Sequence, residues 1–388
     1  MTSSTNSPRR TLRTGPFPRA LTCAESTPVY PGEIPRRLLR VADAGELIAA
    51  LPAMLGFVPE RSLVVAVLHG PGQVGGAAIE AVVRFDLDGA GDPRHIEQFT
   101  ACVSGVVVRE QGTGVLAIVV DDRAPSSAAA LLRTAVLLDA LGAEGIAVRG
   151  AWSVPAIAAG QRYRNLFEPG ADGYVGDPAA SMIAVSQVLD GRQIRRSRTE
   201  LTALVAADEL RCARLRPLLD PAVRHYRDRL AAAQRSGQGP AFQRRALEWV
   251  LWQIADTESG VPRDERELAR LAATLRDRPI RDAMYGLALG DHAEAAEQLW
   301  AQLARATPGA DRAEAAALLG FSAYLRGDGP FAGIALAAAV DADATHPMAV
   351  LLETSLQSGL RPESLRKLAH CGHQIAADLG VDIGPVEP

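Results

Sequence analysis

The sequence contains little lysine and little cysteine. Of its 41 basic residues only Lys367 is a lysine, and the 388 residues carry a net charge of −4. A mildly acidic chain is a poor candidate for non-specific binding to nucleic acid or to an anionic membrane. The four cysteines, Cys23, Cys102, Cys212 and Cys371, are far apart and form no CxxC pair. We therefore expect reduced thiols rather than a disulfide framework.

Long apolar stretches are also missing. No segment approaches the roughly 20 apolar residues that a membrane-spanning helix needs. Residues 1–35 are rich in Ser, Thr, Pro and Arg and have no apolar core of the kind found in secretory signals. We expect this segment to be a disordered tail and the protein to be cytoplasmic.

Motifs for catalysis or cofactor binding are absent as well. The chain has no GxSxG and no GxxxxGK[ST] sequence. The string at 70–75 matches GxGxxG by letter, but a strand signal follows it where a dinucleotide site needs a helix, so it is interpreted as a hairpin loop. His370, Cys371 and His373 lack a nearby fourth ligand, and the end of a surface helix is the favoured interpretation. No cofactor or metal is expected.

Strand and helix signals alternate between residues 36 and 155. The valine-rich runs at 62–68 and 114–120 are typical of strands covered on both faces. Further strands are expected at 38–41, 78–87 and 145–154, with helices at 44–55, 95–109 and 127–141. This order predicts an α/β domain with a mixed sheet.

Beyond residue 155 the strand signals stop. We expect an irregular segment at 156–178 and helices at 178–189, 198–211, 221–234, 241–255 and 264–275. This gives a helical region at 156–280, followed by a helical repeat at 281–372 and a frayed tail at 373–388.

The repeat is marked by Gly290-Asp291, which recurs 37 residues later as Gly327-Asp328. Each pair lies between two apolar helical patterns. Glycine can end the first helix in the left-handed conformation, and aspartate can cap the second. The unit resembles a tetratricopeptide repeat, with matching positions at Leu319-Gly320, Gly327, Ala332, Leu336 and Ala339, although the usual length of that repeat is about 34 residues. The sequence thus predicts an all-α C-terminal domain with tetratricopeptide-like helix pairs.

Several stretches together resemble a family, domain-of-unknown-function family 4192, found in actinobacteria. The most specific is the opening, GELIAALP at 45–52, LGFVP at 55–59 and SLVV at 62–65; RFDL at 84–87, 191–201 and 299–336 are also similar. The resemblance implies a cytoplasmic protein and supplies no activity. Typical members carry a cysteine-containing segment after the last strand, where this chain has RYRNLF at 162–167. A metal or redox role for that segment is therefore not expected here.

Asp121 and Asp122 follow an inner strand at its carboxyl end, where open α/β sheets bind ligands. With Asp86 or Asp88 from another strand end, they could hold Mg²⁺. The alternative is a solvated loop in which an aspartate caps the next helix, and a lone acidic pair has little motif specificity.

Arginines provide the remaining candidates. Arg162 and Tyr163 are expected near the join between the two halves of the chain, where they could bind a ligand in a cleft; sealing that join is the favoured alternative. A basic cluster at 192–198 could bind a phosphate or an acidic partner, although pairing with neighbouring acids such as Glu200 is the more usual role.

Two functional hypotheses remain. The preferred one is a non-catalytic interaction or scaffold protein that binds a protein partner through the helical repeat. The alternative is an enzyme or a small-molecule or metal binder that uses a cleft at the carboxyl ends of the strands, with Asp86, Asp121, Asp122 and Arg162 as contacts. Neither nucleic acid nor a membrane is expected as a partner.

Overall fold

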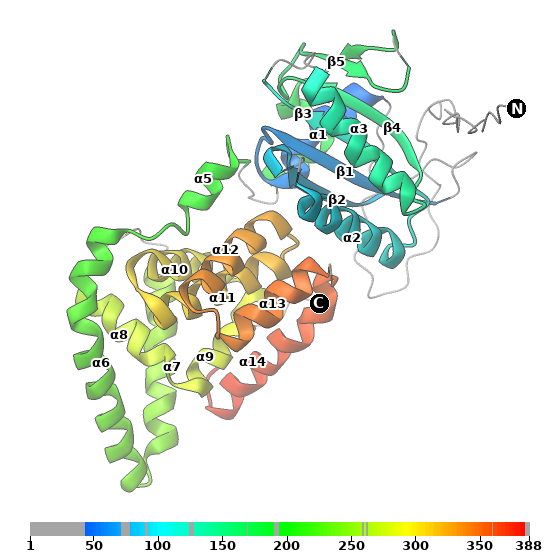
Figure 1. Cartoon of the computed structure of the whole chain (residues 1–388). Coiled ribbons are helices and arrows are strands. Elements are labelled where there is room, and N and C mark those ends of the chain that lie inside the picture. Colours follow the sequence, from blue (N-terminus) through cyan, green and yellow to red (C-terminus); the bar gives the residue numbers. More distant parts are fainter. Residues whose placement is uncertain are drawn as a thin grey trace, which may run out of the picture. The chain divides into compact units, whose positions relative to one another are not determined.

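The computed structural model describes residues 43–70, 78–89, 92–123, 128–168, 170–189, 194–257, 260, 263–358 and 360–384 (Figure 1). The chain divides into two compact units. The first comprises Met1–Met54 and Pro59–Arg192, and the second comprises Leu55–Val58 and Gln193–Pro388. None of the described helices is both long and apolar enough to cross a membrane.

The first unit is built on a mixed sheet of six strands in the order β2-β1-β3-β4-β5-β6. Its strands are β1 (Ser62–His69), β2 (Ala78–Asp86), β3 (Gly114–Val120), β4 (Val148–Val154), β5 (Arg162–Asn165) and β6 (Gly173–Tyr174). Only β3 and β4 pair in parallel, and the other neighbours are antiparallel. β1 and β2 form the predicted hairpin, although the GxGxxG string between them lies mostly outside the described residues.

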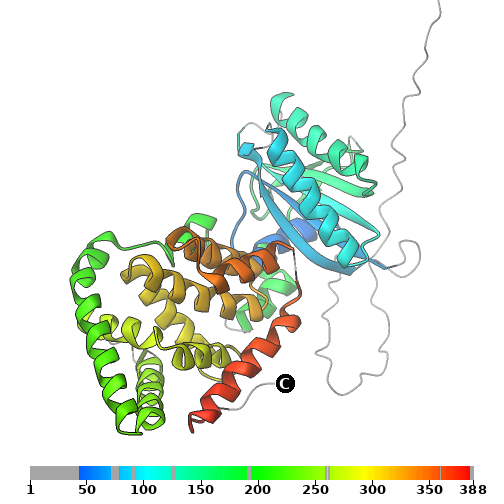
Figure 2. The same cartoon turned by 60° about the horizontal axis from the view of Figure 1, so that its bottom comes forward.

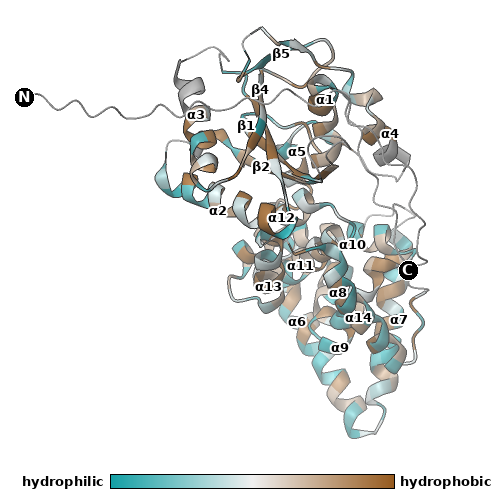
Figure 3. Cartoon of the chain, turned by 90° about the vertical axis from the view of Figure 1, so that its right-hand side faces the viewer, coloured by the Kyte–Doolittle hydropathy of each residue, from teal (hydrophilic) through white to brown (hydrophobic). Residues whose placement is uncertain are grey.

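The valine-rich strands are buried on both faces, as their composition predicts. Helices α2 (Pro93–Arg109) and α3 (Ala128–Ala143) pack on one face, where Leu63, Val65 and Val67 join Phe99 and Leu137 in one apolar cluster. Helix α1 (Ala44–Leu55) lies on the other side of the sheet (Figure 3). A mixed-sheet α/β region is therefore confirmed.

The strand structure does not end at Val154, contrary to the sequence analysis. The segment expected to be irregular adds β5 and β6 to the sheet, and a short 3₁₀ turn (Pro178–Ala180) and α4 (Met182–Leu189) follow. Side-chain burial alternates along β5 as in other strands: Tyr163 is buried, and Arg162 and Arg164 are exposed. A four-residue strand with two arginines gives too weak a signal to be found by hydrophobicity alone. Residues 156–192 group with the sheet, and the strand expected at 38–41 lies outside the described residues.

The second unit is helical. Its elements are α5 (Arg198–Ala203), α6 (Glu209–Arg235), α7 (Gly239–Thr257), α8 (Glu265–Leu275), α9 (Arg278–Met284), the 3₁₀ helix η3 (Tyr285–Leu289), α10 (Ala293–Ala306), α11 (Gly309–Leu325), α12 (Gly329–Ala342), α13 (Pro347–Gln357), η4 (Pro362–Leu365) and α14 (Arg366–Asp378). The long helices α6 and α7 lie side by side (Figure 2).

The boundaries of α6 differ from the prediction. The helix expected at 198–211 breaks after α5, because the Asp208 side chain accepts a hydrogen bond from the Arg211 amide (3.0 Å) and caps a new helix. This new helix then continues through Pro217 and Pro221 to Arg235, so the end of the first predicted helix and the whole of the helix predicted at 221–234 belong to one helix. Packing against α7 and α8 outweighs the two amide donors that the prolines remove.

The two Gly-Asp pairs of the repeat behave differently. At the second pair the prediction is confirmed: Gly327 has φ +83°, and Asp328 accepts a hydrogen bond from the Phe331 amide at 3.1 Å. At the first pair it is wrong, since Gly290 is extended with φ −121° and no side chain caps the start of α10. Here the preceding helix ends in the 3₁₀ segment η3, which already turns the chain.

Glycines allow two close helix contacts in this unit. A Cβ on Gly320 of α11 would lie 2.7 Å from Leu336 Cγ of α12. A Cβ on Gly372 of α14 would lie 2.5 Å from the Gly286 amide nitrogen of η3. Because α14 continues to Asp378 and both Val381 and Ile383 are buried, the tail expected to fray from residue 373 is packed as far as Gly384.

Because Asp328 caps a helix and Asp291 does not, replacing each by alanine should change the free energy of unfolding by different amounts. Asp328→Ala removes the cap of α12 and should lower the free energy of unfolding by about 1 kcal/mol. Asp291→Ala, at the equivalent exposed and non-capping position, should change it by less than about 0.5 kcal/mol. Urea unfolding followed by circular dichroism measures both, and equal losses would contradict the assignment.

Candidate functional site

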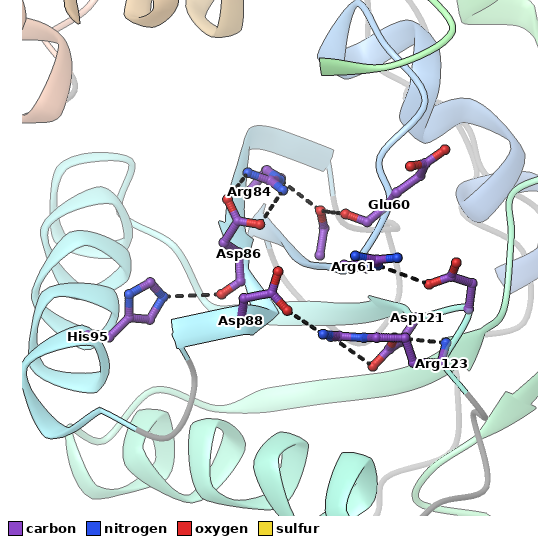
Figure 4. A network of polar contacts seen from close by, with 10 residues as sticks. Glu60, Arg61, Arg84, Asp86, Asp88, His95, Asp121 and Arg123 are labelled. Atoms are coloured by element: carbon purple, nitrogen blue, oxygen red, sulfur yellow. Dashed lines mark hydrogen bonds and ion pairs between the residues drawn. The ribbon is translucent and has the colours of Figure 1, made fainter. Parts of the chain in front are cut away.

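The carboxyl ends of β2 and β3 meet at one edge of the sheet. Ser62, the first residue of β1, is paired with Asp86 at the end of β2 and with Val120 at the end of β3. Because β1 is antiparallel to both neighbours, its start lies between their ends. Asp86 and Asp121 are thereby brought to the same edge (Figure 4), and Asp122 follows Asp121 in the chain.

Asp86 belongs to a network with Arg84 and Ser62. The Arg84 guanidinium donates two parallel hydrogen bonds to the Asp86 carboxylate, both at 2.9 Å, and its Nε donates to Ser62 Oγ at 2.7 Å. Ser62 is fully buried and donates to the Glu60 carbonyl at 2.6 Å. The His95 ring of α2 contacts the Asp86 carbonyl at 3.2 Å. A bidentate pair of this kind orients both side chains.

Asp121 is the most deeply buried of the candidate aspartates, with 2% of the residue exposed. Its amide donates to the Val154 carbonyl of β4 (3.1 Å), and its carboxylate accepts hydrogen bonds from the Arg123 amide (3.1 Å) and Nε (2.9 Å). Arg123 Nη1 also donates to Asp88. The hydrogen bond to Asp121, followed by the one to Asp88, raises the pKa of Arg123 above its usual value.

The Asp122 side chain is exposed to solvent. Its carboxylate pairs with Arg61 Nε at 3.3 Å, and both side chains are at least half exposed. The Arg61 backbone has φ +44°, a conformation that residues with a side chain rarely adopt, and its carbonyl accepts a hydrogen bond from the Leu87 amide at 2.9 Å. Strained backbone of this kind is often found at functional sites.

The charges at this edge are largely compensated. The four aspartates at 86, 88, 121 and 122 each pair with one of the arginines at 61, 84 and 123. Within the described parts of the chain, no group of three or more His, Cys, Asp or Glu residues is arranged to hold a metal ion. The arrangement therefore suits an internally paired polar network better than a carboxylate cage for Mg²⁺.

Arg162 and Tyr163 lie on β5, two strands away from β3. Arg162 donates to the Asp172 carboxylate at 2.9 Å, and Asp172 also accepts the Asn165 amide at 3.2 Å. Tyr163 is buried, and this burial raises its pKa, with further contributions from Asp43 and Asp172. Arg162 thus has a local partner in the segment between β5 and β6.

The other candidates are engaged locally too. In the basic cluster, Arg195 pairs with Glu200 at 3.7 Å, which agrees with the usual role of such clusters, while Arg192 lies outside the described residues. In α14, His370 contacts the Arg366 carbonyl (2.7 Å) and His373 the Gly384 carbonyl (2.8 Å).

Sequence reasoning missed the three arginines and His95 in the edge network. One signal was available: residues two apart in a strand share a face, so Arg84 and Asp86 are expected to be neighbours. The pairing of Arg123 with Asp88 depends on the sheet register and had no local signal.

Replacing Asp121 or Asp122 by asparagine should lower the free energy of unfolding by clearly different amounts. Asp121→Asn weakens the hydrogen bonds of a buried carboxylate to Arg123 and should cost about 2 kcal/mol of unfolding free energy. Asp122→Asn removes only an exposed ion pair and should cost less than about 1 kcal/mol. Urea unfolding of both variants checks this, and a larger loss for Asp122→Asn would show that the buried pair is not the stronger one.

Comparison with known proteins supports the family resemblance. The family model for the domain of unknown function DUF4192 matches residues 45–363, a range that begins within α1 and ends within η4. No curated protein and no solved structure matched the chain. The family model covers most of both compact units. The chain therefore belongs to the DUF4192 family.

Proposed function

We propose that the chain is a non-catalytic interaction protein whose tetratricopeptide-like C-terminal helices bind a protein partner. The observation that carries the proposal is the outer face of α13, where Val350 and Leu351 are exposed and no charged residue is fully exposed. Because the chain resembles actinobacterial members of the family, we also propose an actinobacterial origin and a cytoplasmic location.

Helix α13 is two-sided. Ala349 and Leu352 are fully buried where the helix packs against α11 and α12. On its outer side Val350 is 40% exposed and Leu351 58% exposed. The exposed positions of this helix and its C-cap are Pro347, Val350, Leu351, Thr354, Gln357 and Ser358. They include no charged residue, and depletion of charge around exposed apolar side chains such as Val350 and Leu351 is typical of the centres of protein interfaces.

The packing order of the helices supports the same surface. α10, α11, α12 and α13 each pack on the next, so that α11 is almost entirely buried and cannot line an open groove. In a helical solenoid the helix after α13 would cover its outer face. Here α14 packs instead against α9 and η3, with the close approach of Gly372 to Gly286. We therefore propose α13, rather than a concave groove, as the partner-binding element.

A second candidate is binding of a small molecule at the edge of the sheet. The convergence of four aspartates and three arginines near the unusual Arg61 backbone favours it. Thermal shift assays with phosphate, nucleotides and small carboxylic acids test this candidate. A ligand that stabilises the wild type and not Arg123→Ala would support it.

For the interaction function, Leu351→Asp should abolish partner binding, because burying a new charge in an apolar interface is costly. Leu210→Asp is the matched control, since Leu210 is an exposed leucine (77%) on α6 of the same unit. The measurement is affinity capture from native lysate with quantitative mass spectrometry.

A protein recovered with the wild type and with Leu210→Asp, but reduced at least tenfold with Leu351→Asp, is the expected result. If all three baits recover the same proteins, the surface of α13 is not the binding site.

A further inference from the structure

Strand β2 is an edge strand of the sheet among the strands that the structure describes, because only β1 pairs with it. It is nine residues long, and every residue in it is partly exposed. An edge strand carries a row of backbone N–H and C=O groups that can pair with another strand. The side chains of Ala81, Val83 and Phe85 pack on the core of the first unit. The backbone groups at this edge therefore belong to a strand that is held in place by core packing.

The register shows which backbone groups face outwards. The Leu87 amide donates to the Arg61 carbonyl of the segment leading into β1. The backbone N–H and C=O groups of successive residues in a strand point to opposite sides. Phe85 and Val83 therefore also direct their N–H and C=O groups towards β1. Asp86, Arg84 and Val82 direct theirs away from β1. The register between β1 and β2 shifts at Val67 and Leu68 and passes over Glu80, which marks a bulge in β2. The outward row therefore runs from Val82 to Asp86, and Glu80 lies at the bulge where this row ends.

The charges along this row suit a second copy of the same strand in one register. If two β2 strands pair antiparallel around Val82, Glu80 of each lies opposite Arg84 of the other. Pairing around Val83 would oppose Glu80 to Asp86, and pairing around Arg84 would oppose two arginines. Opposite charges stabilise directly facing cross-strand pairs and like charges destabilise them. The charge order thus selects the register centred on Val82.

We propose that two copies of this chain associate through antiparallel pairing of β2 with β2, with the two-fold axis at Val82. Arg84 keeps its contacts with Asp86 and Ser62, and its two terminal amino groups have further N–H donors for a carboxylate. The bulge at Glu80 ends the ladder, because bulges interrupt further pairing. The interface uses the first unit only and is independent of the function proposed for α13.

Charge exchange tests the register in the full chain. By light scattering coupled to size exclusion, the wild type should have twice the 41.0 kDa mass of one chain. Glu80→Arg alone and Arg84→Glu alone oppose like charges and should each be monomers. Glu80→Arg has a positive charge at positions 80 and 84, and Arg84→Glu has a negative charge at both. In a mixed dimer of the two variants, each facing pair of positions 80 and 84 therefore has opposite charges. An equimolar mixture should therefore recover the doubled mass.

Two outcomes would overturn the proposal. One is a monomeric wild type. The other is a mixture that stays monomeric while circular dichroism shows that both variants are folded.

Disulfide formation is a second test that leaves Arg84 in place. With Cys23 and Cys371 replaced by serine, Val82→Cys puts two cysteines opposite each other at a Cα separation of about 5.5 Å, within reach of a disulfide. Glu80→Cys is the control, because the proposed register separates its two copies by about 14 Å. Oxidation should give a covalent dimer for Val82→Cys and at least tenfold less for Glu80→Cys. Equal or absent cross-linking of both variants contradicts the register.

Discussion

The first unit depends on the pairing of β1 between β2 and β3. Ser62 to Val67 are completely buried, so both faces of this strand must be covered, and α1 and the pair α2 and α3 do this from opposite sides. The antiparallel direction of β1 also determines the chemistry of the edge. It places the ends of β2 and β3 side by side, and with them the aspartates and arginines of the polar network.

That network shows why acidic residues at strand ends are weak evidence for a metal site. Asp121 is buried, and a buried carboxylate requires hydrogen-bond donors, which Arg123 provides from two residues further along the chain. The arginine also reaches Asp88, and so ties the segment after β3 to the turn after β2. The same interactions that hold these loops together leave little carboxylate charge for a cation.

The second unit is organised by close helix packing, which alanine and glycine allow. Gly320 lets α12 approach α11, and Gly286 and Gly372 let α14 lie directly against η3. This last contact has a consequence beyond packing. It directs the C-terminal helix α14 to α9 and η3, and Val350 and Leu351 on the outer face of α13 stay exposed.

By itself the sequence determined the mixed α/β region, the following helical region, the β1–β2 hairpin and the Gly327-Asp328 turn, because each depends on local composition, periodicity or turn chemistry. It also indicated that Asp86 and Asp121 lie at the ends of two different strands. Only the tertiary structure decided that β5 joins the sheet, that α6 continues through Pro217 and Pro221, and that Gly290 is extended. It also decided which arginine pairs with which aspartate. In all these cases, contacts between residues distant in the sequence outweigh the local preference, and such contacts leave no periodic signal along the chain.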